Sequence, residues 1–302
     1  MGSGPFEVES LAPDELRLHL YEDYVGRTPG HMTELVYRAV ADSASIEDAM
    51  AKGTVDVVWR GLNAAAITRL NEQVAASPKQ QTDGGYTQLR LAGVRVLQLE
   101  WSPTSRARRS KPLRTAIALA LQGDRTSASL VPAGVVGSVP VFPQGGKASP
   151  KVTWKNRINL SLGYDPTTPN AQDIAIQIRT RLENTGGLSV KLAPGEVGAD
   201  LNLVDRKAWT ATALAWLQPY LSAPLPEVAD TVTTLETAFR RANLGAGADA
   251  LLSALQKQSA VDLTDLPLSQ SDEYLYARAG VEVAQTSFGP GWQLGLWGIT
   301  GG

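Results

Sequence analysis

The chain has no cysteine and only two histidines among its 302 residues. The absence of cysteine excludes disulfides, thiolate nucleophiles and zinc sites with cysteine ligands. His19 lies in an alternating strand pattern and His31 beside a turn glycine, which favours packing or surface roles over catalysis. No His-x-x-x-His, His-Glu-x-x-His or EF-hand spacing occurs in the sequence. We therefore expect no catalytic residue and no metal site.

The sequence also lacks a dominant charge sign and a long apolar run. Lys and Arg number 28 against 30 Asp and Glu, so no global positive field would recruit nucleic acid or an anionic membrane. No stretch of about 18 uninterrupted apolar residues offers a membrane span. A composition of 43% hydrophobic and 19% charged residues is typical of a globular protein.

Three sequence motifs that are typical of enzymes are absent, incomplete or in the wrong structural context. There is no Gly-x-Ser-x-Gly segment of the α/β-hydrolase type. Residues 145–148 suggest a phosphate loop, but Val141 occupies the position of its first glycine and Ala148 that of its Ser or Thr. Residues 245–250 match Gly-x-Gly-x-x-Ala, yet they follow a helical pattern, whereas a dinucleotide fingerprint follows a strand. We therefore expect no cofactor and no enzyme.

The hydrophobic pattern predicts strands alternating with helices. Strand patterns come at residues 6–10, 16–21, 34–40 and 55–59, then at 88–91 and 95–99 around Ala92-Gly93, which reads as a tight hairpin. A short helix is expected from Ser45 to Gly53, and a second, capped by Asn63, to about Val74. This order is typical of an open α/β sheet.

A second α/β unit is predicted further along the chain. A helix at 113–121 precedes a loop rich in Pro and Gly at 131–150. A strand at 157–163, a helix from Asn170 to the Gly186-Gly187 stop, and strands at 188–192 and 200–204 follow. Two more helices are expected at 227–242 and 248–258, before an extended tail.

Several segments together resemble one family. They are Gly2-Ser3-Gly4-Pro5-Phe6-Glu7-Val8, Glu22-Asp23-Tyr24, Gly53-Thr54-Val55-Asp56-Val57-Val58, Leu113-Arg114-Thr115-Ala116-Ile117-Ala118 and Asp124-Arg125. In this order the chain resembles the extracytoplasmic solute-binding proteins of ABC transporters, the peptide and nickel binding family (family 5). The resemblance covers nearly the whole chain. It does not include a counterpart of the family's N-terminal segment.

This resemblance implies an α/β protein with the second type of periplasmic-binding-protein fold. Lobe I would comprise residues 1–97 and 268–302 and be incomplete relative to the family. Lobe II would comprise residues 98–267. The chain would cross between the lobes near residues 97–103 and 263–268, and a ligand cleft would lie between them.

Two pairs at expected strand ends are candidate ligand contacts. Trp59 offers a flat apolar surface and Arg60 a planar fork suited to carboxylate or phosphate, at the strand end where such sheets bind ligands. Glu100 beside Trp101 could receive an ammonium or amide group. The alternative for the first pair is that Trp59 packs in the hinge with Arg60 at the surface. For Glu100 and Trp101 the alternative is packing together with a helix-cap network.

Residues 216–221 correspond to a region in which the family carries Asp-Tyr-x-Asp-Pro, whose carboxylate receives a peptide's N-terminal ammonium. No Asp occurs here before Asp230, so the peptide anchor is missing. Gln218 and Tyr220 are therefore candidate contacts to an amide, a sugar or another uncharged solute. We expect ordinary di- to pentapeptides to bind poorly.

The resemblance implies that the protein binds a small solute, peptide-like or otherwise polar, by closure of two lobes and delivers it to an ABC permease outside the cytoplasm. The alternative is an enzyme or accessory protein on a shortened binding fold, cytoplasmic if Met1 is the natural start. The incomplete lobe should expose apolar surface, which predicts completion by a second copy in a homodimer, by another chain, or by the tail with Trp292 and Trp297.

Overall fold

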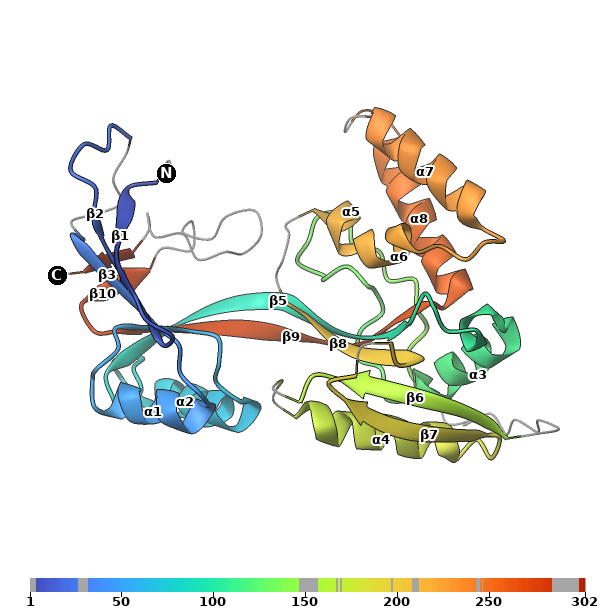
Figure 1. Cartoon of the computed structure of the whole chain (residues 1–302), viewed down its shortest axis with the longest axis horizontal. Coiled ribbons are helices and arrows are strands. Elements are labelled where there is room, and N and C mark those ends of the chain that lie inside the picture. The colour runs from blue at the N-terminus through green and yellow to red at the C-terminus, as the bar shows by residue number, and fades with distance from the viewer. Residues whose placement is uncertain are drawn as a thin grey trace. The chain divides into compact units, whose positions relative to one another are not determined.

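The computed structural model describes residues 4–26, 32–146, 157–166, 168, 170–196, 198–207, 212–242, 245, 247–283 and 299–301. The chain forms two compact units. Unit 1 comprises Met1–Leu91 and Glu273–Gly302, and unit 2 comprises Ala92–Asp272. Strands β5 (Tyr86–Trp101) and β9 (Asp265–Arg278) run from one unit into the other (Figure 1). The lobe limits expected from the sequence fall inside these two strands and stay a prediction.

The strands form a six-stranded sheet in the order β4-β9-β5-β8-β6-β7, a three-stranded sheet β1-β2-β3 and a two-stranded sheet of β10 and β11. Unit 1 contains β1 (Phe6–Leu11), β2 (Glu15–Leu20), β3 (Glu34–Arg38), α1 (Ser43–Ala51), β4 (Val57–Trp59), α2 (Ala64–Ala76), β10 (Val281–Val283) and β11 (Ile299–Gly301). Unit 2 contains a 3-10 turn (Ala107–Arg109), α3 (Lys111–Gln122), β6 (Ile158–Tyr164), α4 (Ala171–Glu183), β7 (Leu188–Pro194), β8 (Leu201–Lys207), α5 (Ala213–Trp216), α6 (Gln218–Ser222), α7 (Ala229–Ala242) and α8 (Ala248–Asp262).

The three-stranded sheet of unit 1 has one apolar and one charged face. Antiparallel pairing places Val8 opposite Leu18 and Leu18 opposite Leu35, so these side chains share a face. The other face carries a hydrogen bond between Glu7 and His19 and ion pairs of Arg17 with Glu15 and Glu34 and of Arg38 with Glu15. In the part of these strands that the structure describes, every side chain on the apolar face is half-buried or exposed.

The rest of unit 1 has a small core between its helices and the sheet. The Asn63 carboxamide accepts a hydrogen bond from the Ala66 amide at 2.8 Å and begins α2, as the sequence predicts. Side chains of α1, α2 and three strands meet in a cluster of buried residues: Met50, Val58, Leu62, Ala66, Leu70, Tyr86 and Tyr276. This cluster holds α1 and α2 against strands β4, β5 and β9.

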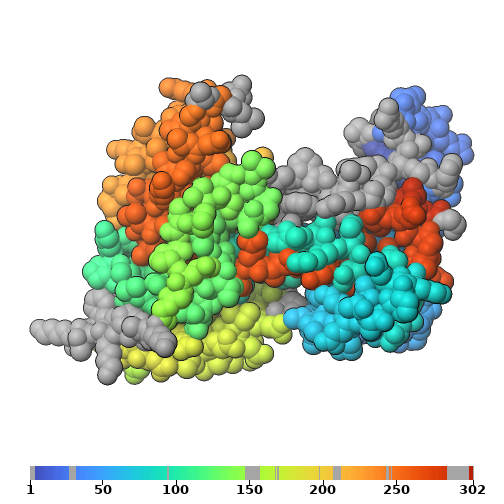
Figure 2. All heavy atoms as spheres, turned by 180° about the vertical axis from the view of Figure 1, so that it is seen from behind, coloured from blue at the N-terminus to red at the C-terminus, as the bar shows by residue number. Residues whose placement is uncertain are grey.

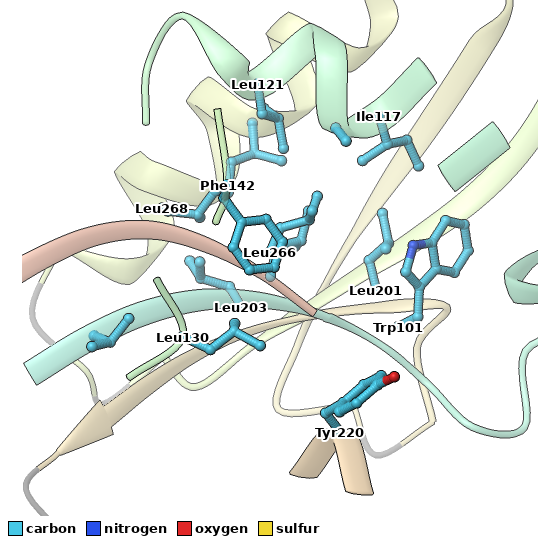
Figure 3. Close-up of a cluster of buried hydrophobic side chains, with 14 of the residues drawn as sticks. Trp101, Ile117, Leu121, Leu130, Phe142, Leu201, Leu203, Tyr220, Leu266 and Leu268 are labelled. Carbon is cyan, nitrogen blue, oxygen red and sulfur yellow. The ribbon is translucent and has the colours of Figure 1, made fainter. Parts of the chain in front are cut away.

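Unit 2 has a much larger core. Strand β6 lies parallel to both β7 and β8, and β8 lies antiparallel to β5. Helix α3 is capped by Ser110, has Pro112 in its first turn and repeats apolar residues on one face. Figure 3 shows side chains from α3, β5, β8, β9 and the loop after α3 meeting in one cluster, among them Ile117, Leu121, Trp101, Leu201, Leu203, Leu266, Leu268, Leu130 and Phe142.

The loop after α3 is held on α8 by one glutamine. Gln256 is 1% exposed, donates to the Gly137 carbonyl at 2.7 Å and accepts from the Val139 amide at 2.9 Å. Figure 2 shows this loop, drawn in green, against the orange α8 on the same face of the unit. This side chain satisfies two backbone groups of a loop in which Pro132, Pro140 and Pro143 lack the N–H that regular pairing requires.

The hairpin predicted at Ala92-Gly93 is wrong, because β5 runs through this position as one strand. Gly93 has φ of +62°, and its amide donates to Asp272 Oδ1 at 2.7 Å. A Cβ at this position would lie 2.2 Å from the Gln270 side chain. The glycine therefore serves an irregularity within a strand and not a turn between two strands.

Candidate functional site

Unit 2 contains a pocket of about 350 Å³ that joins the ends of several elements. It is lined by Glu100, Trp101, Pro103, Arg108, Arg206, Gln218, Pro219, Ser222, Ala223 and Asp265. Glu100, Trp101 and Gln218 were predicted from the sequence, and the structure brings these three together. The lining combines charged groups with proline, alanine and indole surfaces, as ligand pockets commonly do.

Glu100 and Arg206 form a two-pronged ion pair in the pocket. Arg206 Nε and Nη2 donate to the two carboxylate oxygens of Glu100, each at 2.8 Å. Glu100 lies on β5 opposite Asn202 of β8, and Arg206 is four residues further along β8, on the same face. Burial and the negative charge of Asp265 raise the pKa of Glu100 to about 7, although Arg206 acts in the opposite direction.

Asp265 and Arg108 are pocket residues that the sequence analysis missed. Asp265 is the first residue of β9, and Thr264 Oγ1 donates to its Oδ2 at 2.7 Å. Burial raises the pKa of Asp265 and lowers that of Arg108. Arg108 donates from Nη2 to the carbonyl oxygen of Ala223, next to α6. Since these residues are far apart in the sequence, only the topology of β9 and α6 brings them together.

Trp101 and Tyr220 have buried rings. Trp101 is 4% exposed, and its indole Nε1 has no hydrogen-bond partner among the described residues. Tyr220 is 1% exposed and donates from its hydroxyl to Asp262 Oδ2 at 2.6 Å, while burial raises its pKa. Both rings belong to the buried cluster of unit 2 that Figure 3 shows. Tyr220 lies in α6 between two lining residues, Gln218 and Ser222, without lining the pocket itself.

Trp59 and Arg60 belong to unit 1. The Arg60 guanidinium carbon lies 4.8 Å from the centre of the Trp59 ring. Arg60 also donates from Nε and Nη2 to the carboxylate of Glu273, which is 4% exposed, at distances of 3.0–3.2 Å. The Arg60 guanidinium, which was expected to contact a ligand, thus donates hydrogen bonds within the chain from two of its three nitrogens. Whether all six predicted residues line one cleft stays a prediction, because they belong to two units.

Two other properties bear on the site. Among the described residues, no helix combines the length and apolar character that a membrane crossing requires. In the same parts of the chain, no three or more His, Asp or Glu side chains gather in an arrangement that could hold a metal ion.

Comparison with solved structures shows the fold. The dipeptide-binding protein from Pseudoalteromonas sp. SM9913, in complex with Met-Leu, matches with a TM-score of 0.78 at 15% identity over 99% of this chain and 64% of its own. DppA from Helicobacter pylori, in complex with the peptide STSA, matches with 0.76 at 16% identity over 99% and 62%. NikA from Brucella suis, in complex with Fe(III)-EDTA, matches with 0.72 at 16% identity over 100% and 68%. The predicted α/β periplasmic-binding-protein fold is therefore confirmed.

Sequence comparison adds the family. The chain spans 62% and 64% of the length of the H. pylori and Pseudoalteromonas proteins. Among curated proteins no sequence matches the chain. Residues 1–171, more than half of the chain, match the middle part of a family of bacterial binding proteins. The chain belongs to the bacterial extracellular solute-binding proteins of family 5.

Proposed function

We propose that the protein binds a small polar solute reversibly, outside the cytoplasm, and delivers it to the permease of an ABC transporter. Its family and fold support this role. The observation that carries the proposal is the pocket of unit 2, where Glu100, Trp101 and Gln218 meet. Its volume of about 350 Å³ suits a compact solute, since small-molecule pockets span roughly 300–1,000 Å³.

The ligand type follows from this chain's own residues. The solved relatives were captured with a peptide, a dipeptide and a metal chelate, so the shared fold does not specify one ligand. The segment 216–221 of this chain has no carboxylate, and Gln218 contributes an uncharged amide to the pocket. We infer that an uncharged polar solute binds better than the N-terminus of a peptide.

An inventory of bound solutes tests the proposed function. The purified protein is denatured, the released small molecules are identified by mass spectrometry, and each is titrated back into fresh protein by calorimetry. We expect one polar solute to bind saturably, and Gln218→Ala to weaken its binding. As a control, Asp205→Asn removes a carboxylate that pairs with Arg95 outside the pocket. Release of no solute that rebinds would contradict the proposal.

The same experiment addresses the enzymatic alternative. The solute is incubated with the protein and recovered, and its mass is compared before and after. A binding protein returns the solute unchanged, whereas an enzyme on a shortened binding fold would convert it. A chemical change that depends on Glu100 or Asp265 would replace the transport role by a catalytic one.

A further inference from the structure

The pocket holds two buried side chains with unused hydrogen-bonding capacity. Asp265 is 7% exposed, and the bond from Thr264 to Oδ2 leaves Oδ1 without a donor in the described chain. Arg108 is 6% exposed and uses Nη2 on the Ala223 carbonyl, while its Nε has no acceptor among the described residues. Both side chains line the same cavity. A bound group that receives a hydrogen bond from the Arg108 guanidinium and gives one to Asp265 Oδ1 gains affinity, because hydrogen bonds to charged groups are stronger than those between neutral groups.

Arg108 and Asp265 act on each other through space without closing an ion pair. The charge of each opposes the effect of burial on the pKa of the other. Each is nonetheless anchored on a different element, Arg108 beside α6 through Ala223 and Asp265 at the start of β9 through Thr264. A ligand group that receives a hydrogen bond from Arg108 and gives one to Asp265 would complete the contact.

The balance of charges favours an uncharged ligand group. The lining holds two guanidiniums, Arg108 and Arg206, and two carboxyls, Glu100 and Asp265, and Arg206 is already paired with Glu100. An ammonium would be repelled by the guanidiniums as well as attracted by the carboxyls, and a carboxylate the reverse, so neither charge gains a clear net attraction from the lining. A neutral group has neither penalty and uses the same donors and acceptors.

We propose that this pocket recognises an uncharged head group that offers a hydrogen-bond donor and an acceptor side by side, as a primary carboxamide does. Asp265 accepts from the N–H of the head group, and Arg108 donates to its carbonyl oxygen. Gln218 adds a third polar contact, and Pro103 and Pro219 cover the apolar remainder of the solute. The inference rests on the proposed function, because it names the ligand class of the same pocket.

Three probes that share a phenyl ring and differ in the charge of their head group test the inference: benzamide, benzoate and benzylamine. Their dissociation constants are measured on the full chain by ligand-observed NMR. We expect benzamide to bind at least about tenfold more tightly than either charged probe, the factor that follows from one lost hydrogen bond or one like-charge contact. Asp265→Ala should weaken benzamide by about tenfold, and the control Asp205→Asn should leave all three constants unchanged.

A second variant separates hydrogen bonding from charge. Asp265→Asn keeps an oxygen acceptor and removes a negative charge, so the preference for benzamide over benzoate should shrink by about tenfold. The inference is overturned if a charged probe binds best, if no probe binds, or if Asp265→Asn leaves the preference unchanged. If the solute released from the protein has no such head group but still binds saturably, this inference fails while the proposed function stands.

Discussion

Strands in both units alternate apolar and polar residues, but the two units bury the apolar side chains to different extents. In unit 2, Leu201 and Leu203 of β8 are 0% and 6% exposed, because helices and the loop after α3 cover the sheet. In unit 1, Val8 of β1 is 61% exposed, although pairing gives the three-stranded sheet an equally clear apolar face. Alternation sets which side chains share a face, and a second layer is needed to bury them.

The largest expected effect compares two leucines on strands of the two units. Leu201→Ala should lower the free energy of unfolding by about 2–5 kcal/mol, because it opens a cavity in a packed core. Leu18→Ala on the three-stranded sheet should cost about 1 kcal/mol or less, since Leu18 is only half-buried. Urea unfolding of both variants measures the difference. Equal losses would show that the sheet of unit 1 is covered in solution.

The second prediction concerns the ion pair of Arg60 with the buried Glu273 in unit 1. Arg60→Met removes the two-pronged partner of the buried Glu273, which should cost about 1–3 kcal/mol of stability. The control Arg69→Met removes an exposed partner of Glu47 and should cost less than about 1 kcal/mol. Adding Glu273→Gln to Arg60→Met should recover part of the loss. Thermal unfolding of the wild type, the two Arg variants and the double variant measures these losses of stability. Equal losses in Arg60→Met and Arg69→Met would refute the prediction.

The pocket of unit 2 should make stability depend on pH. Because the pKa of Glu100 is raised from 4.5 to about 7, the folded state holds this proton more tightly than the unfolded state. The resulting stabilisation is present below pH 4.5 and is lost as the pH rises through about 7. Between those values the wild type should lose about 1–3 kcal/mol relative to Glu100→Gln. Urea unfolding at several pH values measures how the free energy of unfolding changes with pH in the wild type and in Glu100→Gln. The same pH dependence in both proteins would contradict the raised pKa of Glu100.

The smallest expected effect concerns association. Val8, Leu11, Val25 and Tyr37 in the first part of the chain are exposed, and whether they form the apolar surface expected there stays a prediction. Its burial in a homodimer stays a prediction, and the tail with Trp292 and Trp297 lies outside the described residues. Light scattering over a dilution series should show a dimer that Leu18→Lys dissociates. A monomer at all concentrations would remove the dimer.

Local features could be predicted from the sequence because neighbouring residues produce them. The Asn63 cap, helix α3 and the positions of Glu100 and Trp101 at the end of a strand are of this kind, whereas Gln218 was singled out through the family resemblance. The start of α1 was missed by one turn, since Asp42 and not Ser45 accepts the capping bond. The cap of α4 was also misjudged, because the Asn170 side chain makes no capping bond.

Features that depend on distant segments could not be predicted in the same way. Gly93 reads as a turn until Asp272, far along the chain, is seen to accept a hydrogen bond from its amide. Asp265 and Arg108 carry no local signal of a site, because only the return of β9 beside β5 and the contact of Arg108 with Ala223 place them in the pocket. The fold was thus easier to anticipate than the residues that complete the pocket.

The most direct test of the account is a crystal structure of the protein with the solute that it releases on denaturation. The account predicts a compact solute in the pocket of unit 2, with an uncharged head group within hydrogen-bonding distance of Asp265 and Arg108 and a further contact to Gln218. A solute bound away from these residues, or a charged group of the solute against Asp265, would contradict it.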